Sequence, residues 1–243
     1  MIEAVNVKNL VKIYSKKVKA LDRISFHVEE GEIFGLIGPN GAGKTTTLRI
    51  ISTLLKPTSG EVTVYGIDVV KNPMEVKKII SYLPEESGAY KNLKGREFIR
   101  FIARLNTDDS TEEKRMVEVA EEISQLGERL DDKISTYSKG MLRRLLLAVT
   151  LMRRPKLAIL DEPTSGLDVI NANRVRRIIK KYIRENDATA LVSSHNMLEV
   201  EYLCDRVAII HKGRIIAEGE PQELKSRYNA SNLEEVFLKV IGI

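Results

Sequence analysis

Short apolar runs alternate with amphipathic segments along most of the chain. Three runs have the length of buried strands: residues 32–37, 156–160 and 188–193. Helical periodicity follows the first run in residues 47–55 and recurs in residues 168–186, and residues 206–219 predict a hairpin around Lys212 and Gly213. Strands that alternate with helices are typical of an α/β fold with a mostly parallel sheet.

The strand-and-helix alternation is interrupted between residues 86 and 134, where the pattern is helical only. Residues 93–105 repeat apolar side chains at helical spacing, and residues 110–126 begin with a capping-box pattern, Ser110 and Glu113. The predicted apolar face of the first of these helices consists of Phe98, Ile99, Ile102 and Leu105. We therefore predict a helical subdomain inserted into the α/β core.

The C-terminal segment predicts one more amphipathic helix. It begins with a second capping-box pattern, Ser231 and Glu234. Its predicted buried face consists of Leu233, Val236, Phe237 and Val240. We expect this helix to pack back on the domain.

A glycine-rich segment directly follows the first predicted strand. Its sequence matches G-x-x-x-x-G-K-[ST], between a strand and a helix, which is the setting of a phosphate-binding loop. Lys44 is placed to reach the β- and γ-phosphates of a nucleotide, and the Thr45 hydroxyl to hold Mg²⁺. The alternative is a glycine-rich turn with a solvated lysine. The segment consists of Gly38, Pro39, Asn40, Gly41, Ala42, Gly43, Lys44, Thr45 and Thr46.

Two acidic residues, Asp161 and Glu162, follow the second apolar run, at the strand end where open α/β sheets bind ligands. We expect Asp161 to belong to the Mg²⁺ shell and Glu162 to polarise an attacking water. A solvated turn is the alternative interpretation. The P-loop upstream favours the interpretation of Asp161 and Glu162 as catalytic residues.

A second helix start also has the features of an anion site. Ser138, Lys139 and Gly140 precede an apolar helix with arginines at 143 and 144, and a helix N-terminus with a serine cap attracts phosphate.

The composition adds little to the functional interpretation. A net charge of +5 is spread among 34 acids, the single cysteine excludes an internal disulfide, and no apolar run approaches the ~18 residues of a membrane span. We expect a cytosolic chain.

These motifs and their order resemble the ATP-binding-cassette (ABC) ATPase family. After the P-loop, SYLPEE stands where the family has its glutamine loop, YSKGM where it has its signature, and LAILDEP follows. TSGLD, ending at Asp168, is similar to the dimer-contact loop, and SSH, ending at His195, to the switch histidine. The resemblance covers nearly the whole chain.

The resemblance implies a head-to-tail dimer in which ATP lies between one P-loop and the partner's signature helix. Ser138, Lys139 and Gly140 would then serve the ATP of the partner, and His195 would contact the γ-phosphate. Tyr14 stands where the family stacks an aromatic ring on adenine. Two motifs depart from the usual pattern: Glu85 replaces the glutamine of the glutamine loop, and in the signature Lys139 replaces the first glycine and Met141 the glutamine. Glu85 is expected near Mg²⁺ or the attacking water.

The organisation implied is a P-loop core with a mostly parallel sheet, an antiparallel β portion and an inserted helical subdomain. We expect core in 1–85 and 146–220, the helical subdomain with the signature in 86–145, and a helical tail in 221–243. The cofactors implied are ATP and Mg²⁺, and the partners a second ATPase subunit and an integral-membrane permease, in a peripheral complex on the cytoplasmic face of the membrane. An export-type transporter is favoured. The alternative is an ABC ATPase that acts on nucleic acid or ribosomes, but the span from Lys44 to Lys139 leaves no room for the long insertions of such relatives, so no nucleic acid is expected.

Overall fold

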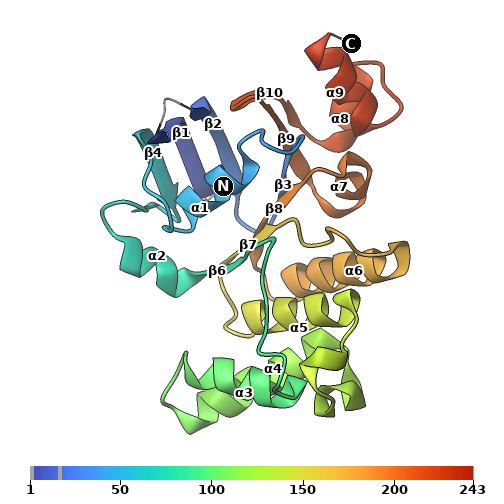
Figure 1. Cartoon of the computed structure of the whole chain (residues 1–243). Helices are drawn as coiled ribbons and strands as arrows, with labels where there is room; N and C mark the ends of the chain where they lie inside the picture. Colours follow the sequence, from blue (N-terminus) through green and yellow to red (C-terminus); the bar gives the residue numbers. More distant parts are fainter. Residues whose placement is uncertain (1–2, 16–17, 243) are drawn as a thin grey trace.

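The fold is an α/β architecture with two sheets. The computed structural model describes residues 3–15 and 18–242 (Figure 1). The strands are β1 (Glu3–Ile13), β2 (Lys19–Glu29), β3 (Ile33–Ile37), β4 (Ser59–Val64), β5 (Ile67–Asp68), β6 (Ile80–Leu83), β7 (Leu157–Asp161), β8 (Thr189–Ser194), β9 (Arg206–His211) and β10 (Arg214–Gly219). The helices are α1 (Lys44–Ile51), α2 (Pro73–Ile79), α3 (Gly95–Arg104), α4 (Ser110–Ser124), α5 (Lys139–Leu151), α6 (Val169–Glu185), α7 (Met197–Leu203), α8 (Pro221–Arg227) and α9 (Leu233–Ile241).

The central sheet has six strands in the order β10-β9-β3-β8-β7-β6. All neighbouring pairs are parallel except β9 and β10, which form the predicted hairpin with Lys212 and Gly213 at positive φ. The three predicted strands are adjacent in this sheet as β3, β8 and β7. The mostly parallel core expected from the sequence is therefore confirmed.

The first apolar run is buried on both faces of the sheet, which explains why it does not alternate with polar residues. Phe34 and Leu36 of β3 pack in a cluster with β1, β2 and α1, whereas Ile33 and Ile37 pack in a second cluster with α5 and α6. The smaller sheet, β2-β1-β4-β5, is antiparallel and covers the first of these faces (Figure 1). It is the antiparallel portion expected from the sequence.

The helical insertion lies at the far end of the molecule from the antiparallel sheet. Figure 1 shows α3 and α4 there, with α5 between them and the central sheet. α5 packs on α3, α4 and β6. Because α5 begins directly after Ser138, the signature segment is placed where the helical part meets the core. Within the described residues, no helix combines the length and the apolar character needed to cross a bilayer.

The structure corrects three local predictions. Asp109, not Ser110, caps α4, and it accepts from the backbone N–H groups of Thr111 and Glu112. Helix α9 is capped by Asn232, and Glu235 rather than Glu234 reaches back to the Ser231 backbone. In each case two cap-forming residues stand side by side: the first of the pair caps α4, and the second caps α9. Leu105 follows the last residue of α3 and is 68% exposed, so it is not part of the buried face.

The helices predicted over residues 168–186 and at the C-terminus both bury an apolar face. Val175, Ile178, Ile179, Tyr182 and Ile183 of α6 are buried. In α9, Leu233 and Val236 are buried, and Phe237 and Val240 pack against the same cluster in part. The C-terminal helix thus packs back on the domain, as expected.

Candidate functional site

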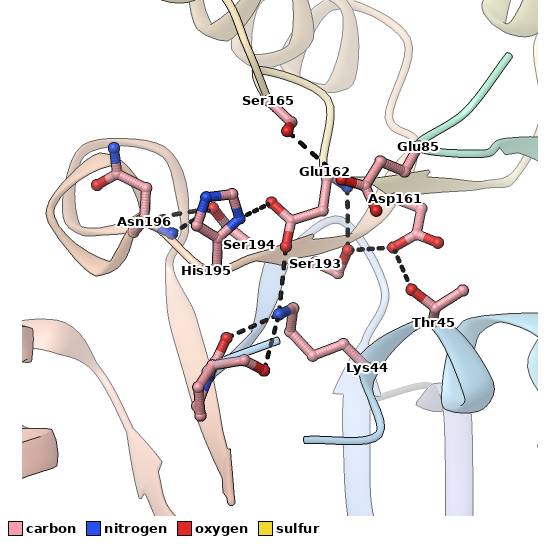
Figure 2. Close-up of polar contacts among 12 residues, drawn as sticks. Lys44, Thr45, Glu85, Asp161, Glu162, Ser165, Ser193, Ser194, His195 and Asn196 are labelled. Carbon is pink, nitrogen blue, oxygen red and sulfur yellow. Dashed lines mark hydrogen bonds and ion pairs between the residues drawn. The ribbon is translucent and has the colours of Figure 1, made fainter. Parts of the chain in front are cut away.

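Four adjacent strand ends gather the candidate residues (Figure 2). The P-loop follows β3, Glu162 follows β7, His195 follows β8 and Glu85 follows β6. The register makes these ends level, because Ile37 pairs with Ser194 and Asp161 with Ser193. Parallel pairing therefore brings together segments that are far apart in the sequence.

The P-loop wraps around the ammonium group of Lys44. Lys44 is the first residue of α1 and is only 6% exposed, and its Nζ donates to the carbonyl oxygens of Gly38 at 2.7 Å and Pro39 at 3.3 Å. Gly43, just before the helix, has a φ of 116°, a backbone conformation that residues other than glycine rarely adopt. The loop thus turns sharply enough to start α1 with its backbone N–H groups directed at the site.

Gly38 is the position in this loop with the tightest steric limit. A Cβ there would lie 2.1 Å from the carbonyl oxygen of Ile210, whereas a Cβ at Gly41, also at positive φ, meets nothing within 4 Å. We expect Gly41→Ala to lose about 1–2 kcal/mol of unfolding free energy through backbone strain alone. Gly38→Ala should lose clearly more, because the backbone of β9 must also shift. Urea unfolding without nucleotide measures both, and equal losses would contradict the steric argument.

Glu162 lies at the centre of the site with both carboxylate oxygens engaged. Its Oε1 is 3.2 Å from Nζ of Lys44 and its Oε2 is 2.8 Å from Nδ1 of His195. The side chain is 4% exposed and the backbone φ is 48°. The contact with Lys44 is an ion pair without hydrogen-bond alignment, so Oε1 accepts no hydrogen bond from the described residues. A buried carboxylate oxygen in this state is suited to accept from a water.

Asp161 is fixed by hydroxyl groups from three other segments. Its Oδ1 accepts from Ser193 at 2.5 Å and from Thr45 at 3.3 Å, and its Oδ2 accepts from the Tyr82 phenol at 3.2 Å. Burial and the neighbouring Asp161 carboxylate raise the pKa of Tyr82 to about 12, which keeps the phenol a donor. Sequence reasoning missed Tyr82 and Ser193 as partners of Asp161, because only sheet pairing reveals which strand lies beside β7.

The donor set of this site fits Mg²⁺ in association with phosphates. Thr45 and Asp161 supply hard oxygen atoms, but the described residues contain no cluster of three or more histidine, cysteine or acidic side chains suited to a metal. Mg²⁺ retains water and is commonly held by one or two carboxylates plus substrate phosphates. Thr45 and Asp161 are therefore the residues that would hold it, with the remaining ligands supplied by nucleotide and water.

The surface hollow at the P-loop brings together many of the predicted residues. Its lining contains the charged and hydroxyl groups Lys44, Thr45, Thr46, Glu85 and Glu162. Asn40, Gly41, Gly43 and Ala20 complete it, and Ala20 was not foreseen from the sequence. Glu85 is exposed and its Oε1 accepts from Ser165 at 3.4 Å. The acid at the glutamine position thus lies in the same hollow as Lys44.

Tyr14 lies beside the P-loop helix. Its hydroxyl is 3.3 Å from the Thr46 hydroxyl, and Nζ of Lys12 lies 5.3 Å from the centre of its ring. Tyr14 as a whole is 37% exposed. An exposed aromatic ring next to a phosphate-binding loop is a suitable platform for a flat base.

The signature segment lies apart from this hollow. Ser138 caps α5 by accepting from the Met141 backbone, and Ser138 and Lys139 are exposed. Gly140 is buried against Asn171, whose Cγ would lie 2.4 Å from a Cβ at this position. Asp168 caps α6 and accepts from the Asn171 backbone at 3.0 Å. Within one chain, neither Asp168 nor the signature residues line the P-loop hollow.

Comparisons with known proteins identify the family of this chain. The family model described as "ABC transporter" matches residues 21–165. The linearmycin resistance ATP-binding protein LnrL of Bacillus subtilis (strain 168) is 40% identical over all of this chain and 76% of its own length. The ATP-binding protein NatA of the same organism is 38% identical over 92% of this chain and 91% of its own. The bacitracin transport ATP-binding protein BcrA of Bacillus licheniformis is 37% identical over 93% and 73%.

Solved structures give the same result. An ATP-binding subunit of an ABC transporter has a TM-score of 0.82 at 28% identity and covers 98% of this chain and 99% of its own. A dimeric ATP-binding cassette in a post-hydrolysis state, bound to ADP and phosphate, has a TM-score of 0.78 at 25% identity over 89% of this chain and 98% of its own. The chain therefore belongs to the ABC transporter family, as one of its ATP-binding and ATP-hydrolysing subunits.

Proposed function

We propose that this subunit works as a head-to-tail dimer that closes around two Mg-ATP. We further propose that the opening and closing of the dimer drives a conformational change in a membrane permease. The observation that carries the dimer is the separation of two phosphate-binding features in one chain. The P-loop lines its own hollow, while the signature helix start is exposed elsewhere. The free N–H groups at a helix N-terminus can bind a phosphate. Among the described residues of this chain no phosphate site lies next to them, and a second chain can bring its bound nucleotide there.

In the closed dimer, Lys44 and the P-loop backbone would hold the phosphates of one ATP, with Tyr14 against its base. Ser138, Lys139 and Gly140 of the second subunit would face the γ-phosphate, next to its Asp168. When Mg²⁺ is bound it neutralises phosphate charge, and Thr45 and Asp161 are its proposed holders. This assignment gives each of the two anion sites one role in the same reaction.

Glu162 is the proposed general base. Its buried, under-satisfied Oε1 supports this role, as does the contact of its Oε2 with His195. We propose that His195 holds the Glu162 carboxylate and reaches the γ-phosphate, and that Glu85 contacts the metal or the attacking water. The exposed position of Glu85 lets solvent reduce its repulsion of phosphate.

The permease contact is proposed at the boundary of the helical part. The segment after Glu85 leads to Tyr90, which is 61% exposed and packs edge-on against Phe98 and Phe101. Tyr90 and Phe101 line a surface hollow together with Leu93. An exposed aromatic cluster of this kind suits the apolar face of a short helix. We propose that residues 86–145 move as a unit against 1–85 and 146–220, with 221–243 as a tail.

Export is the proposed direction of transport. The relatives include a linearmycin resistance protein and a bacitracin transport protein, and resistance to an antibiotic is explained by its removal from the cell. The subunit would then lie on the cytoplasmic face of the membrane, where ATP is available. Action on nucleic acid or ribosomes is not favoured, because these relatives are named for resistance or transport.

The test of the shared site is the solution mass of Glu162→Gln with and without Mg-ATP. The substitution is expected to keep ATP bound, so ATP should convert monomer to dimer. Ser138→Arg in the same background should abolish the dimer by filling the anion site, whereas Ser135→Arg, at an exposed position three residues earlier, should not. Protein that binds ATP and remains monomeric would contradict closure between two copies of this chain.

A further inference from the structure

A buried arginine in the signature helix binds the backbone that carries Glu162. Arg143, in the second turn of α5, is 7% exposed. Its Nη2 donates to the carbonyl oxygens of Asp161 at 2.9 Å and Glu162 at 2.8 Å, and its Nε donates to that of Pro163 at 2.8 Å. Three consecutive carbonyls at the end of β7 are thus held by one side chain of another element.

The remaining nitrogen of the same guanidinium binds the segment that carries Glu85. Nη1 of Arg143 donates to the carbonyl oxygens of Pro84 at 3.0 Å and Glu85 at 3.2 Å, and lies 3.4 Å from Oγ of Ser87. Every nitrogen of the group is therefore used. This segment is the first part of the connection from β6 to α3 and to the aromatic cluster around Tyr90.

Among the described residues Arg143 has no direct ion pair, and its charge is balanced by carboxylates at a distance. Its direct partners are carbonyl oxygens and one hydroxyl, while the carboxylates of Asp161, Glu85 and Glu162 act on it through space. Burial lowers the pKa of Arg143, and these three carboxylates oppose that effect. A cation held in this way connects the position of the signature helix to the position of the three acidic residues.

We propose that Arg143 is a positioning residue for hydrolysis, which fixes Glu162 and the Glu85 segment relative to the signature helix. The proposal rests on the proposed function, in which Glu162 activates water and Ser138 receives the partner's ATP. Ser138 caps the helix that carries Arg143, so a displacement of α5 on contact with that ATP is passed to both acidic residues. Arg143 touches neither water nor nucleotide in this role.

The adjacent residue offers a matched control. Arg144 is also 7% exposed and also donates to carbonyl oxygens, those of Ser124 at 3.2 Å and Gln125 at 2.9 Å. Both of its partners belong to the end of α4, away from the P-loop hollow. Arg144 therefore has the same exposed fraction as Arg143 and also binds backbone carbonyls of the described residues, through Nη1 alone, without contact with the site.

The experiment compares Arg143→Lys with Arg144→Lys in the full chain. Lysine keeps the charge, but its single nitrogen cannot span two backbone segments. We measure urea unfolding, ATP affinity and kcat for both variants, and for Glu162→Gln in parallel. Arg143→Lys should lower kcat by about 10- to 100-fold, as expected for misplacement of a reacting group. Its ATP dissociation constant should stay within about threefold, and Arg144→Lys should retain kcat within about twofold, with the stability loss of each variant taken from its own urea unfolding.

The outcomes test the role proposed for Arg143 separately from the role proposed for Glu162. If Arg143→Lys keeps the wild-type kcat, or if kcat falls equally in both lysine variants, Arg143 has only a structural role and the proposal is wrong. If Glu162→Gln retains turnover, the proposed role of Glu162 is wrong independently of the arginines. A fall in kcat for Arg143→Lys and Glu162→Gln, with Arg144→Lys unaffected, is the result that supports the proposal.

Discussion

Replacement of Glu162 by glutamine is expected to slow ATP hydrolysis by about 10²- to 10⁴-fold while ATP still binds, the range for loss of a general base. Glutamine has the shape of glutamate but cannot take a proton from water. Oε1 of Glu162 is buried, 3.2 Å from Lys44, and accepts no hydrogen bond among the described residues, so it is available to a water. Phosphate release under single-turnover conditions, together with equilibrium ATP binding, measures the two effects separately.

The control for this variant is Glu86→Gln, which removes the same charge from an exposed position next to Glu85. It should hydrolyse ATP at the wild-type rate within about twofold, since surface charges contribute little at a distance. Wild-type turnover in Glu162→Gln would assign water activation to another residue. Loss of binding as well as turnover would instead indicate that the Glu162 side chain has a mainly structural role.

Replacement of Lys44 by alanine is expected to weaken ATP binding about 100-fold or more, since each charge-assisted hydrogen bond contributes roughly 1.5–3 kcal/mol. In this structure Nζ of Lys44 is already held by Gly38, Pro39 and Glu162. The phosphates must therefore compete with the Glu162 carboxylate for the ammonium group. Calorimetric titration with ATP measures the loss, and Lys56→Ala, at an exposed position soon after α1, is the control.

Folding must be separated from binding in this variant, because loss of Lys44 leaves the buried Glu162 carboxylate with His195 alone. Removal of one partner of a buried pair destabilises by roughly 3–5 kcal/mol. The double variant Lys44→Ala, Glu162→Gln removes both charges and should recover much of that stability without recovering ATP affinity. Recovery of both would show that the weak binding came from misfolding and not from the missing ammonium group.

Local patterns predicted the elements of the fold well where a single physical cause dominates. The buried strands were recognised because both faces are covered, as Phe34 and Ile33 on opposite faces of β3 illustrate. The helix caps were placed one residue away, at Ser110 and not Asp109, because adjacent polar residues have nearly the same capping preference. Which of them caps depends on how the chain enters the helix.

The arginines of the signature helix illustrate the limit of such patterns. Arg143 and Arg144 stand together in the sequence, beside the proposed anion site, and nothing local distinguishes them. In the structure both are buried and bind carbonyl oxygens, one set at the end of β7 and the other at the end of α4. Their different partners result from the helical twist of α5 and from the elements packed around it.

The sequence by itself determined where the candidate groups stand along the chain: a P-loop with Lys44 and Thr45, acids after a buried strand, and a second helix start capped by Ser138. These features are local, because a glycine turn or a strand end is encoded in consecutive residues. Only the tertiary structure decided which segments meet: Tyr82 and Ser193 on Asp161, His195 on Glu162, and Arg143 across two strand ends. Strand order and helix packing set these distances, and they arise from burial summed over the whole chain, which no short segment specifies.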